Sequence, residues 1–139
     1  VISDGPGNPS YCSDVVTRLQ KFMANSDKPI LGIGMGCLLL GLAGGMDTYR
    51  LKFGHHSHNQ PVILAGTDRC FITMQNHNYA IREASILGQW KVYLKNLNDN
   101  SVEGIYHTRH PWVGVMFHSE SDRVDTDARF IYDDFIVKL

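Results

Sequence analysis

Two parts of the sequence have residue types and spacing suited to nucleophilic chemistry. The segment Gly32-Ile-Gly-Met-Gly36 has the glycine frame of a nucleophile elbow, in which the middle residue lies on a sharp turn between a strand and a helix. Its flanking residues are glycines, as expected where a Cβ would collide in so tight a turn. His118 ends a predicted strand and Glu120 follows it, a pattern that suits a general base with its orienting carboxylate. The middle residue of the elbow, however, is Gly34, which offers no nucleophilic atom.

A third feature is the glycine- and proline-rich loop Ser3-Asp-Gly-Pro-Gly-Asn-Pro9, which brings backbone close to a neighbouring group. With a cysteine at the elbow, a thiolate would attack an amide carbon. The N–H group of Met35 and a second N–H group from the Gly5–Gly7 loop would then face the resulting oxyanion. The sequence therefore predicts a Cys-His-Glu site from which the cysteine is missing.

The hydrophobic pattern predicts the elements that position these residues. Segment 30–33 is expected to be a buried strand, and the apolar run after the elbow a buried helix. An earlier helix is indicated by apolar residues at helical spacing, namely Val15, Val16, Leu19, Phe22 and Met23. Asn8 or Ser10 is expected to cap it, with Pro9 in its first turn.

A strand–helix–strand order implies a parallel crossover. We therefore predict an α/β fold with a mostly parallel central sheet, flanking helices and a peripheral antiparallel hairpin. The pattern predicts further strands at 48–53, 62–65, 70–74, 79–81, 90–94, 102–106 and 112–117, and polar loops at 54–61 and 75–78. A last helix, capped by Thr126, would have Ile131, Phe135 and Leu139 along one face.

Composition restricts the class of protein. The chain has 139 residues, of which 43% are hydrophobic, enough for a single domain over residues 1–139. It opens on what resembles the end of a strand, so we expect the natural domain to be longer at its N-terminus. A net charge of -1 gives no electrostatic signature of nucleic-acid binding, and no apolar run reaches the ~20 residues of a membrane span. The three cysteines lack metal-site or secreted spacing, which favours an intracellular compartment.

The chain resembles, over essentially its whole length, the class I glutamine amidotransferase domain of carbamoyl phosphate synthetase. The resemblance rests on Ser3-Asp-Gly-Pro-Gly-Asn-Pro9, Pro29-Ile-Leu-Gly-Ile33, Lys52-Phe-Gly-His-His56 with Asn59-Gln-Pro61, Thr73-Met-Gln-Asn-His77, Asn98-Asp99 with Glu103-Gly-Ile105, and the strand leading into His118-Ser-Glu120. It implies a domain that hydrolyses glutamine and passes ammonia to an ATP-dependent ligase part, in the same chain or a separate subunit. No cofactor is expected in this domain, whereas ATP and Mg²⁺ are expected in the ligase part.

Position by position, the resemblance places the family's nucleophilic cysteine at Gly34 and its base and carboxylate at His118 and Glu120. The Pro-Gly turn that usually follows is absent. The positions implied to bind substrate are Gly5, Gly7, Met35, Leu38, Asn76, Asn78 and Tyr79. Leu38 replaces a substrate-contacting glutamine, and Asn78 replaces a glycine. We therefore expect His118 and Glu120 to be vestigial and to hydrogen-bond each other.

Three functional hypotheses follow. The first is a catalytically impaired glutaminase-like domain, a structural or regulatory partner of an ammonia-using ligase. It resembles the ammonia-dependent branch of urea-forming animals, which favours the mitochondrial matrix over the cytoplasm. The match is partial, because that branch carries serine at position 34. The second is an active amidotransferase, in which Cys37 is a displaced nucleophile or a cysteine was deliberately exchanged for Gly34. The third is a stand-alone binding module. The pathway served, urea or pyrimidine synthesis, is left open.

Two sets of residues have both a chemical and a structural interpretation. Cys37 lies at a predicted helix N-terminus but begins an apolar run, which favours a packed core residue over a nucleophile. His55, His56 and His58 lie in a predicted polar loop without an adjoining Cys or carboxylate, which favours solvated histidines over a metal site. The acidic residues near Arg123, namely Asp122, Asp125 and Asp127, are interpreted as a solvated turn and helix start.

Overall fold

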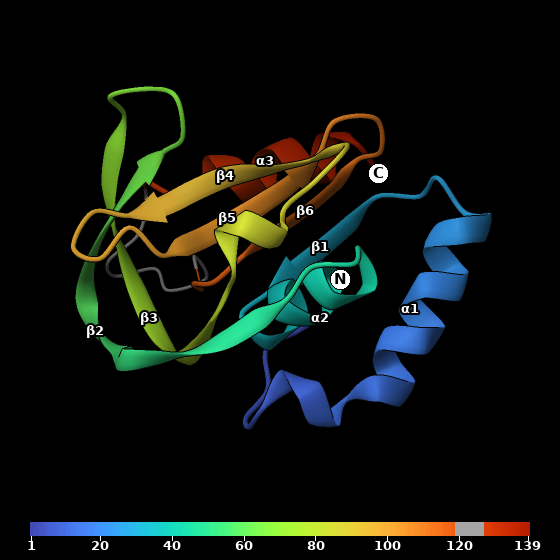
Figure 1. Cartoon of the computed structure of the whole chain (residues 1–139). Helices are drawn as coiled ribbons and strands as arrows, with labels where there is room; N and C mark the ends of the chain where they lie inside the picture. The colour runs from blue at the N-terminus through green and yellow to red at the C-terminus, as the bar shows by residue number, and fades with distance from the viewer. Residues whose placement is uncertain (119–126) are drawn as a thin grey trace.

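The computed structural model describes residues 1–118 and 127–139 of the chain. Its helices are η1 (Pro9–Tyr11), α1 (Ser13–Asn25), α2 (Met35–Ala43), η2 (Glu83–Ser85) and α3 (Phe130–Val137). Its strands are β1 (Ile30–Ile33), β2 (Thr48–Leu64), β3 (Cys70–Ile81), β4 (Trp90–Asn96), β5 (Val102–His107) and β6 (Trp112–Val115). The strands form one six-stranded sheet in the order β1-β6-β5-β3-β2-β4 (Figure 1).

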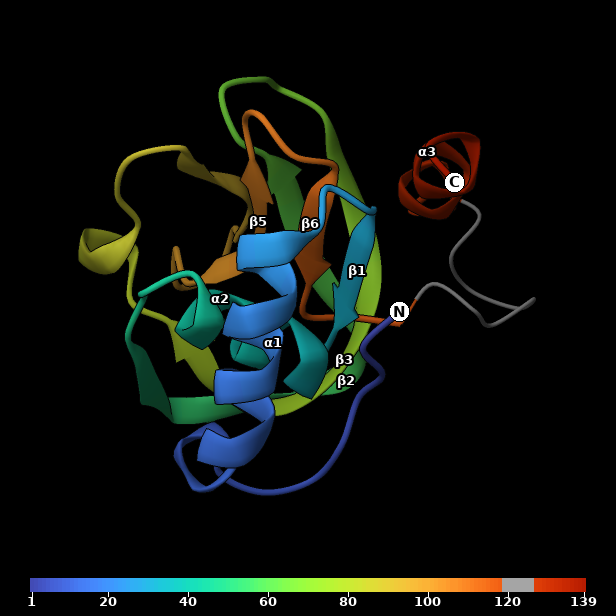
Figure 2. The ribbon, with the colours of Figure 1, turned by 90° about the vertical axis from the view of Figure 1, so that its right-hand side faces the viewer.

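Helices cover both faces of the β1–β6 part of the sheet. Figure 2 shows α2 and the outer helix α1 on one side of β1, and α3 on the other. Ile30 belongs to the apolar cluster that contains the α2 side chains, whereas Leu31 and Ile33 pack against Phe135 of α3. All four residues of β1 are buried, as the sequence predicts. The elbow therefore begins from a strand held on both faces, which fixes its position.

The prediction of a mostly parallel sheet is wrong. Among the strand pairs of the described residues, β1 and β6 run parallel, and every other pair of named strands runs antiparallel. The reason is that β2–β3 and β4–β5 are hairpins of consecutive strands joined by short connections, so the chain returns without a crossover helix. The one parallel pair is β1 with β6. In the sequence, β1 precedes the elbow helix α2 and the two hairpins, and β6 follows them.

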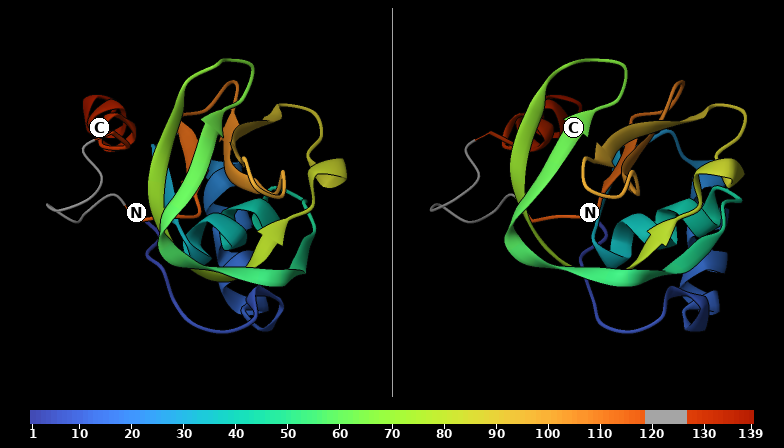
Figure 3. Two further views of the ribbon diagram at one scale, coloured as in Figure 1. Left: turned by 90° about the vertical axis from the view of Figure 1, so that its left-hand side faces the viewer. Right: turned by 60° about the vertical axis from the view of Figure 1, so that its left-hand side comes forward.

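The two predicted polar loops are also strand. Segments 54–61 and 75–78 lie inside β2 and β3, where His55 pairs with His77 and His56 with Asn76. In addition, β4 pairs with both β2 and β5, and β3 meets β5 through Ile81 and Val102. Strands β2 to β5 therefore close into a strongly curved ring (Figure 3). Polar side chains inside this ring bind one another, which explains why no apolar alternation marked these segments as strand.

Other expectations have mixed outcomes. Ile2 forms an isolated parallel bridge with Gly32 of β1, outside the named strands. The prediction that Asn8 or Ser10 caps the first long helix is wrong: the Asn8 side chain accepts the N–H of Ser10 and caps the short helix η1, whereas α1 begins after Cys12 without a side-chain cap. On α1, Val16, Leu19 and Met23 pack on the core, whereas Val15 and Phe22 are exposed. Ile131 and Phe135 of α3 are buried, whereas Leu139 lies beyond the end of α3 and is exposed. Thr126, Asp122, Arg123 and Asp125 lie outside the described residues, and Asp127 is exposed. Among the described helices, none has the length and apolar character of a membrane span.

Candidate active site

The elbow keeps its geometry although it lacks a nucleophile. Gly34 joins β1 to α2 with φ 55° and ψ −116°, a backbone conformation that L side chains rarely adopt. A Cβ at Gly32 would lie 2.6 Å from the carbonyl oxygen of Gly36, and a Cβ at Gly36 would lie 2.0 Å from that of Ile2. The predicted role of the flanking glycines, close approach of backbone, is therefore confirmed.

Asp4 lies at the centre of the site, a position that the sequence analysis missed. Its Oδ1 accepts the N–H of Met35 at 2.7 Å and that of Gly5 at 2.8 Å. Its Oδ2 lies 2.8 Å from Nε2 of His118. Burial alone would raise the pKa of Asp4, but these hydrogen bonds and the charge of His118 lower it, so the carboxylate is ionised. The signal available in the sequence was an acidic residue directly before the glycine of the predicted oxyanion loop.

His118 is positioned by two elements of the sheet. It follows β6 and forms an isolated antiparallel bridge with Met74 of β3. Its side chain is about one-third exposed and bonds Asp4. Glu120 lies outside the described residues, so the predicted His118–Glu120 hydrogen bond stays a prediction. The histidine is therefore close to the elbow, and its partner in the described part of the chain is Asp4.

The residues implied to bind substrate surround one cavity of about 220 Å³. It is lined by Gly5, Gly7, Met35, Leu38, Asn76, Asn78 and Tyr79, together with Asp4, Pro6, His56 and His77. An adjoining cavity of about 430 Å³ shares Asp4, His56 and Asn76 with the first and reaches His118. The structure thus brings the seven residues together beside the elbow, and their role in binding substrate stays a prediction.

The polar wall of these cavities is already internally bonded. Nδ1 of His56 lies 2.7 Å from Oδ1 of Asn76, and Nε2 of His56 lies 2.9 Å from Oδ1 of Asn78. His56 therefore ties together two of the predicted substrate contacts across the β2–β3 hairpin. A ligand in the cavity would meet the side-chain amides of Asn76 and Asn78, whose oxygens are already bonded to the His56 imidazole.

Cys37 is a packed core residue, as the sequence analysis favoured. Its side chain is fully buried, and Sγ would lie 2.8 Å from a Cβ on Gly114 of β6. Burial, reinforced by the charge of Glu103, raises the pKa of the Cys37 thiol far above its usual value. Full burial against β6 therefore favours a structural role for Cys37 over a nucleophilic one.

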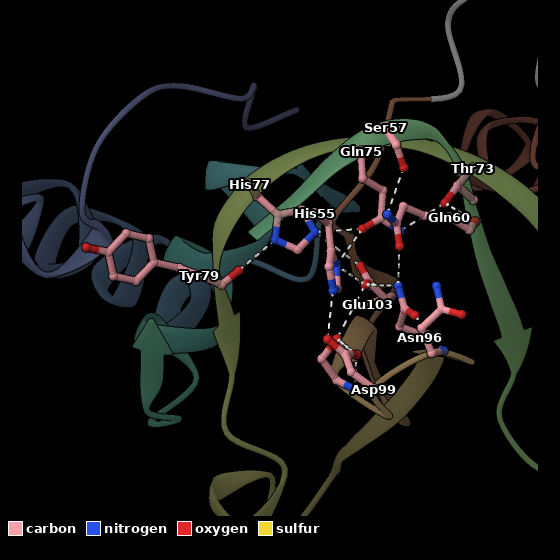
Figure 4. A network of polar contacts seen from close by, with 12 residues as sticks. His55, Ser57, Gln60, Thr73, Gln75, His77, Tyr79, Asn96, Asp99 and Glu103 are labelled. Atoms are coloured by element: carbon pink, nitrogen blue, oxygen red, sulfur yellow. Dashed lines mark hydrogen bonds and ion pairs between the residues drawn. The ribbon is translucent and has the colours of Figure 1, made fainter. Parts of the chain in front are cut away.

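The expectation that His55 is a solvated loop residue is wrong. His55 is 5% exposed and lies inside the β2–β5 ring, where each of the four strands contributes at least one buried polar residue to a network. These residues are His55, Gln75, Asn96 and Glu103 (Figure 4). Nδ1 of His55 lies 2.8 Å from Oε1 of Glu103, and Nε2 of His55 lies 2.8 Å from Oδ2 of Asp99. His56 and His58, in contrast, are exposed.

The hydrogen bonds fix where the protons of this network lie. Thr73 donates its hydroxyl to the carbonyl of Gln60, so it accepts the side-chain NH₂ of Gln75 at 2.9 Å. Oε1 of Gln75 then faces Nδ1 of His55 at 3.0 Å and Nε2 of His77 at 2.7 Å. Both ring nitrogens must donate, because a carbonyl oxygen only accepts. The other nitrogen of His55 also faces an acceptor, Oδ2 of Asp99, so His55 carries a charge that Asp99 and Glu103 balance.

The same atoms include a possible cation-binding set. Ligand atoms of His55, His77 and Glu103 lie within 4.8 Å of one another. Ligands of a tetrahedral ion bound at about 2.0–2.1 Å would stand roughly 3.3 Å apart. The shorter contact of 2.8 Å between His55 and Glu103 is that of a charge-assisted hydrogen bond. The described geometry therefore suits protons shared between the rings and the carboxylate.

This network predicts a loss of stability in alkali. Burial would lower the pKa of His55, but Glu103 and Asp99 raise it from 6.5 to about 9. A raised pKa in the folded state means that the stabilisation is complete below pH 6.5 and disappears as the pH passes 9. We expect the free energy of unfolding to fall by about 2–4 kcal/mol across this window.

Urea denaturation at a series of pH values measures this effect, and His55→Gln provides the control, because its profile should be flatter over the same range. On the acid side, the lowered pKa values of Asp99 and Glu103 place their loss of stabilisation below pH 3.8 and 4.5, respectively. An unchanged free energy of unfolding between pH 6.5 and 9 would contradict the assignment.

Comparison with known proteins agrees with this geometry. The family model of the class I glutamine amidotransferases matches residues 1–138. The arginine-specific small chain of carbamoyl phosphate synthase from Aspergillus niger is 42% identical over 135 residues, which are 97% of this chain and 30% of that protein. The multifunctional protein CAD of Squalus acanthias is 42% identical over 136 residues, which are 6% of that protein. The chain thus spans less than a third of the length of these relatives.

Solved structures share the fold. A GMP synthase protein from Thermoplasma acidophilum superposes with a TM-score of 0.81 at 22% identity, over 97% of this chain and 69% of that one. A glutamine amidotransferase from Thermotoga maritima gives a TM-score of 0.68 at 16% identity, over 84% and 53% of the two chains. At such low sequence identity, these matches support the shared fold alone.

Proposed function

We propose, because the chain belongs to the class I glutamine amidotransferase family, that it is a glutaminase-like domain of a carbamoyl phosphate synthase in which glutamine hydrolysis is impaired. One observation carries the proposal: the elbow is intact in backbone, but residue 34 is glycine. Removing a covalent nucleophile typically costs several orders of magnitude in rate and leaves only binding and oxyanion effects. Leu38 and Asn78 in the cavity wall weaken substrate binding further.

The setting of this domain follows from its relatives. The carbamoyl phosphate synthase small chains and the CAD protein support a partnership with a ligase part, as a separate subunit or in the same chain. We infer that this ligase part uses free ammonia, with ATP and Mg²⁺ bound there, and that the present domain serves it structurally or as a regulator. A mitochondrial location is part of the same proposal.

The full protein that contains this chain, with its ligase part, provides the test. Carbamoyl phosphate formation is measured with ammonium chloride or with glutamine as the nitrogen source. We expect ammonium to support turnover and glutamine to support a rate lower by at least about a thousandfold, because no group forms the thioester. Comparable rates with the two nitrogen sources would overturn the proposal.

An active amidotransferase that uses Cys37 is the alternative, and the same assay separates it. The full burial of Cys37 and its raised thiol pKa oppose this alternative. If a glutamine-dependent rate is found, Cys37→Ser is the informative variant. Loss of that rate in the variant would establish Cys37 as the nucleophile, and its retention would point to another group.

A further inference from the structure

We propose that Asp4 occupies the oxyanion position of this site and that its carboxylate, as well as the missing thiol, prevents amide hydrolysis. The inference rests on the proposed loss of glutaminase activity and goes beyond it, because it names a second obstacle on a different element. In this arrangement a cysteine restored at residue 34 stays inactive until the side chain of Asp4 is also removed.

The hydrogen-bond donors identify the position. An oxyanion hole places two N–H groups about 2.7–3.1 Å from the oxygen that develops charge. In this chain the two N–H groups expected for that purpose come from Met35, at the start of α2, and from the Gly5–Gly7 loop. The oxygen they hold is Oδ1 of Asp4, at 2.7 and 2.8 Å. A substrate carbonyl therefore finds both donors already engaged by an ionised oxygen.

The carboxylate of Asp4, in this position, is sterically incompatible with a side chain at residue 34. A Cβ there would lie 2.3 Å from Oδ1, 2.4 Å from Cγ and 2.8 Å from Oδ2 of Asp4. The carboxylate cannot turn aside without cost, because groups of Met35, Gly5 and His118 all bond it. Gly34 and Asp4 are thus mutually dependent, since the glycine leaves the space that the carboxylate fills.

Charge acts in the same direction as the steric contact. A thiolate beside an ionised carboxylate is disfavoured, so Asp4 would raise the pKa of a thiol introduced at residue 34. Nε2 of His118, the atom that would accept the thiol proton, is already bonded to Oδ2 of Asp4. Asp4 therefore engages both the donors that would stabilise an oxyanion and the base that would activate a nucleophile.

The test combines Gly34→Cys with three side chains at residue 4. These are the native aspartate, Asp4→Ala, which removes the carboxylate, and Asp4→Asn, which keeps its shape without its charge. Iodoacetamide alkylation of the introduced thiol is followed by peptide mapping, which separates it from Cys12, Cys37 and Cys70. Glutamine hydrolysis is measured in parallel on the same full-length proteins.

We expect the introduced thiol to react at least about tenfold faster in the Asp4→Ala background than beside native Asp4, as one unit of pKa implies. Glutamine hydrolysis is expected to rise in Asp4→Ala/Gly34→Cys and not in Gly34→Cys. Asp4→Asn should give an alkylation rate between these two, because the amide fills the same space but carries no charge. Equal alkylation rates beside aspartate and alanine would overturn the inference.

A second measurement avoids any change at the elbow. In Asp4→Ala alone, the amide hydrogen of Met35 loses its acceptor and should exchange at least about tenfold faster, as expected for a lost bond to a charged group. Unchanged exchange would overturn the inference even if the double variants do not fold. Glutamine hydrolysis by the unaltered protein would instead overturn the proposed function, so the two failures are distinguishable.

Discussion

Glu103→Gln is expected to lower the free energy of unfolding by about 3–5 kcal/mol, the typical cost of breaking a buried ion pair. Glu103 has no exposed surface, and its carboxylate lies 2.8 Å from Nδ1 of His55 and 3.4 Å from Nε2 of His77. The amide keeps the volume but removes the charge that balances the His55 ring. Because a domain of this size is stable by only about 5–15 kcal/mol, this loss is large.

The chain offers a matched control for this substitution. Glu83 pairs with Lys95 at the same distance, 2.8 Å, but its side chain is about half exposed. Glu83→Gln should therefore cost less than about 1 kcal/mol. Urea denaturation at neutral pH measures both variants, and the alkaline loss of stability assigned to His55 should shift to lower pH in Glu103→Gln alone. Equal losses in the two variants would show that burial of the network contributes nothing.

The elbow could be predicted from the sequence because its determinants are local. Gly32, Gly34 and Gly36 alternate between a β-branched strand and an apolar helix, and each element is short and continuous in sequence. The same holds for the Ser3–Pro9 loop, whose glycines and prolines dictate its turn. The resemblance to the family then indicated which residues, distant in sequence, line the cavity. The hydrophobic pattern alone does not identify them.

The direction of the strands and the polar network could not be predicted, because both depend on distant pairing. The spacing of Thr73, Gln75 and His77 is that of one strand face, yet all three are polar, and the pattern predicted strand only as far as residue 74 and a loop at 75–78. Their partners are Gln60, His55 and Glu103, on β2 and β5. Only the closure of the ring brings donors and acceptors together and makes polar residues suitable for an interior.

Asp4 illustrates a different limit. Its place in the loop was visible in the sequence, but its side chain was not assigned a role, because the chemistry predicted for the loop involves only backbone N–H groups. The structure shows one of its oxygens on those N–H groups and the other on His118. With glycine at residue 34, the site thus has a satisfied set of hydrogen bonds, which explains how these N–H groups and His118 remain ordered without a ligand.

Gly36→Ala is expected to be severely destabilising, by several kcal/mol, because its Cβ would lie 2.0 Å from the carbonyl oxygen of Ile2 and 2.7 Å from the carbonyl carbon. The obstacle is backbone, so no side chain can turn away. That same carbonyl accepts the N–H of Ile33 at 3.0 Å, which joins the first residues of the chain to β1. The variant must therefore push the segment that carries Asp4 away from the elbow.

Gly41→Ala in the same helix is the control, because its Cβ would meet side chains and no backbone: Cδ1 of Ile81 at 2.7 Å and Sδ of Met46 at 3.7 Å. Alanine also favours a helix interior over glycine by about 1 kcal/mol, which offsets the contact. Thermal unfolding compares the two variants, and hydrogen exchange at Ile33 reports whether the bond to Ile2 is lost. If Gly36→Ala keeps both the melting temperature and the protection of Ile33, the close approach of Ile2 to the elbow is wrong. The contacts of Asp4 with the N–H groups of Met35 and Gly5, which depend on that approach, would then be wrong as well.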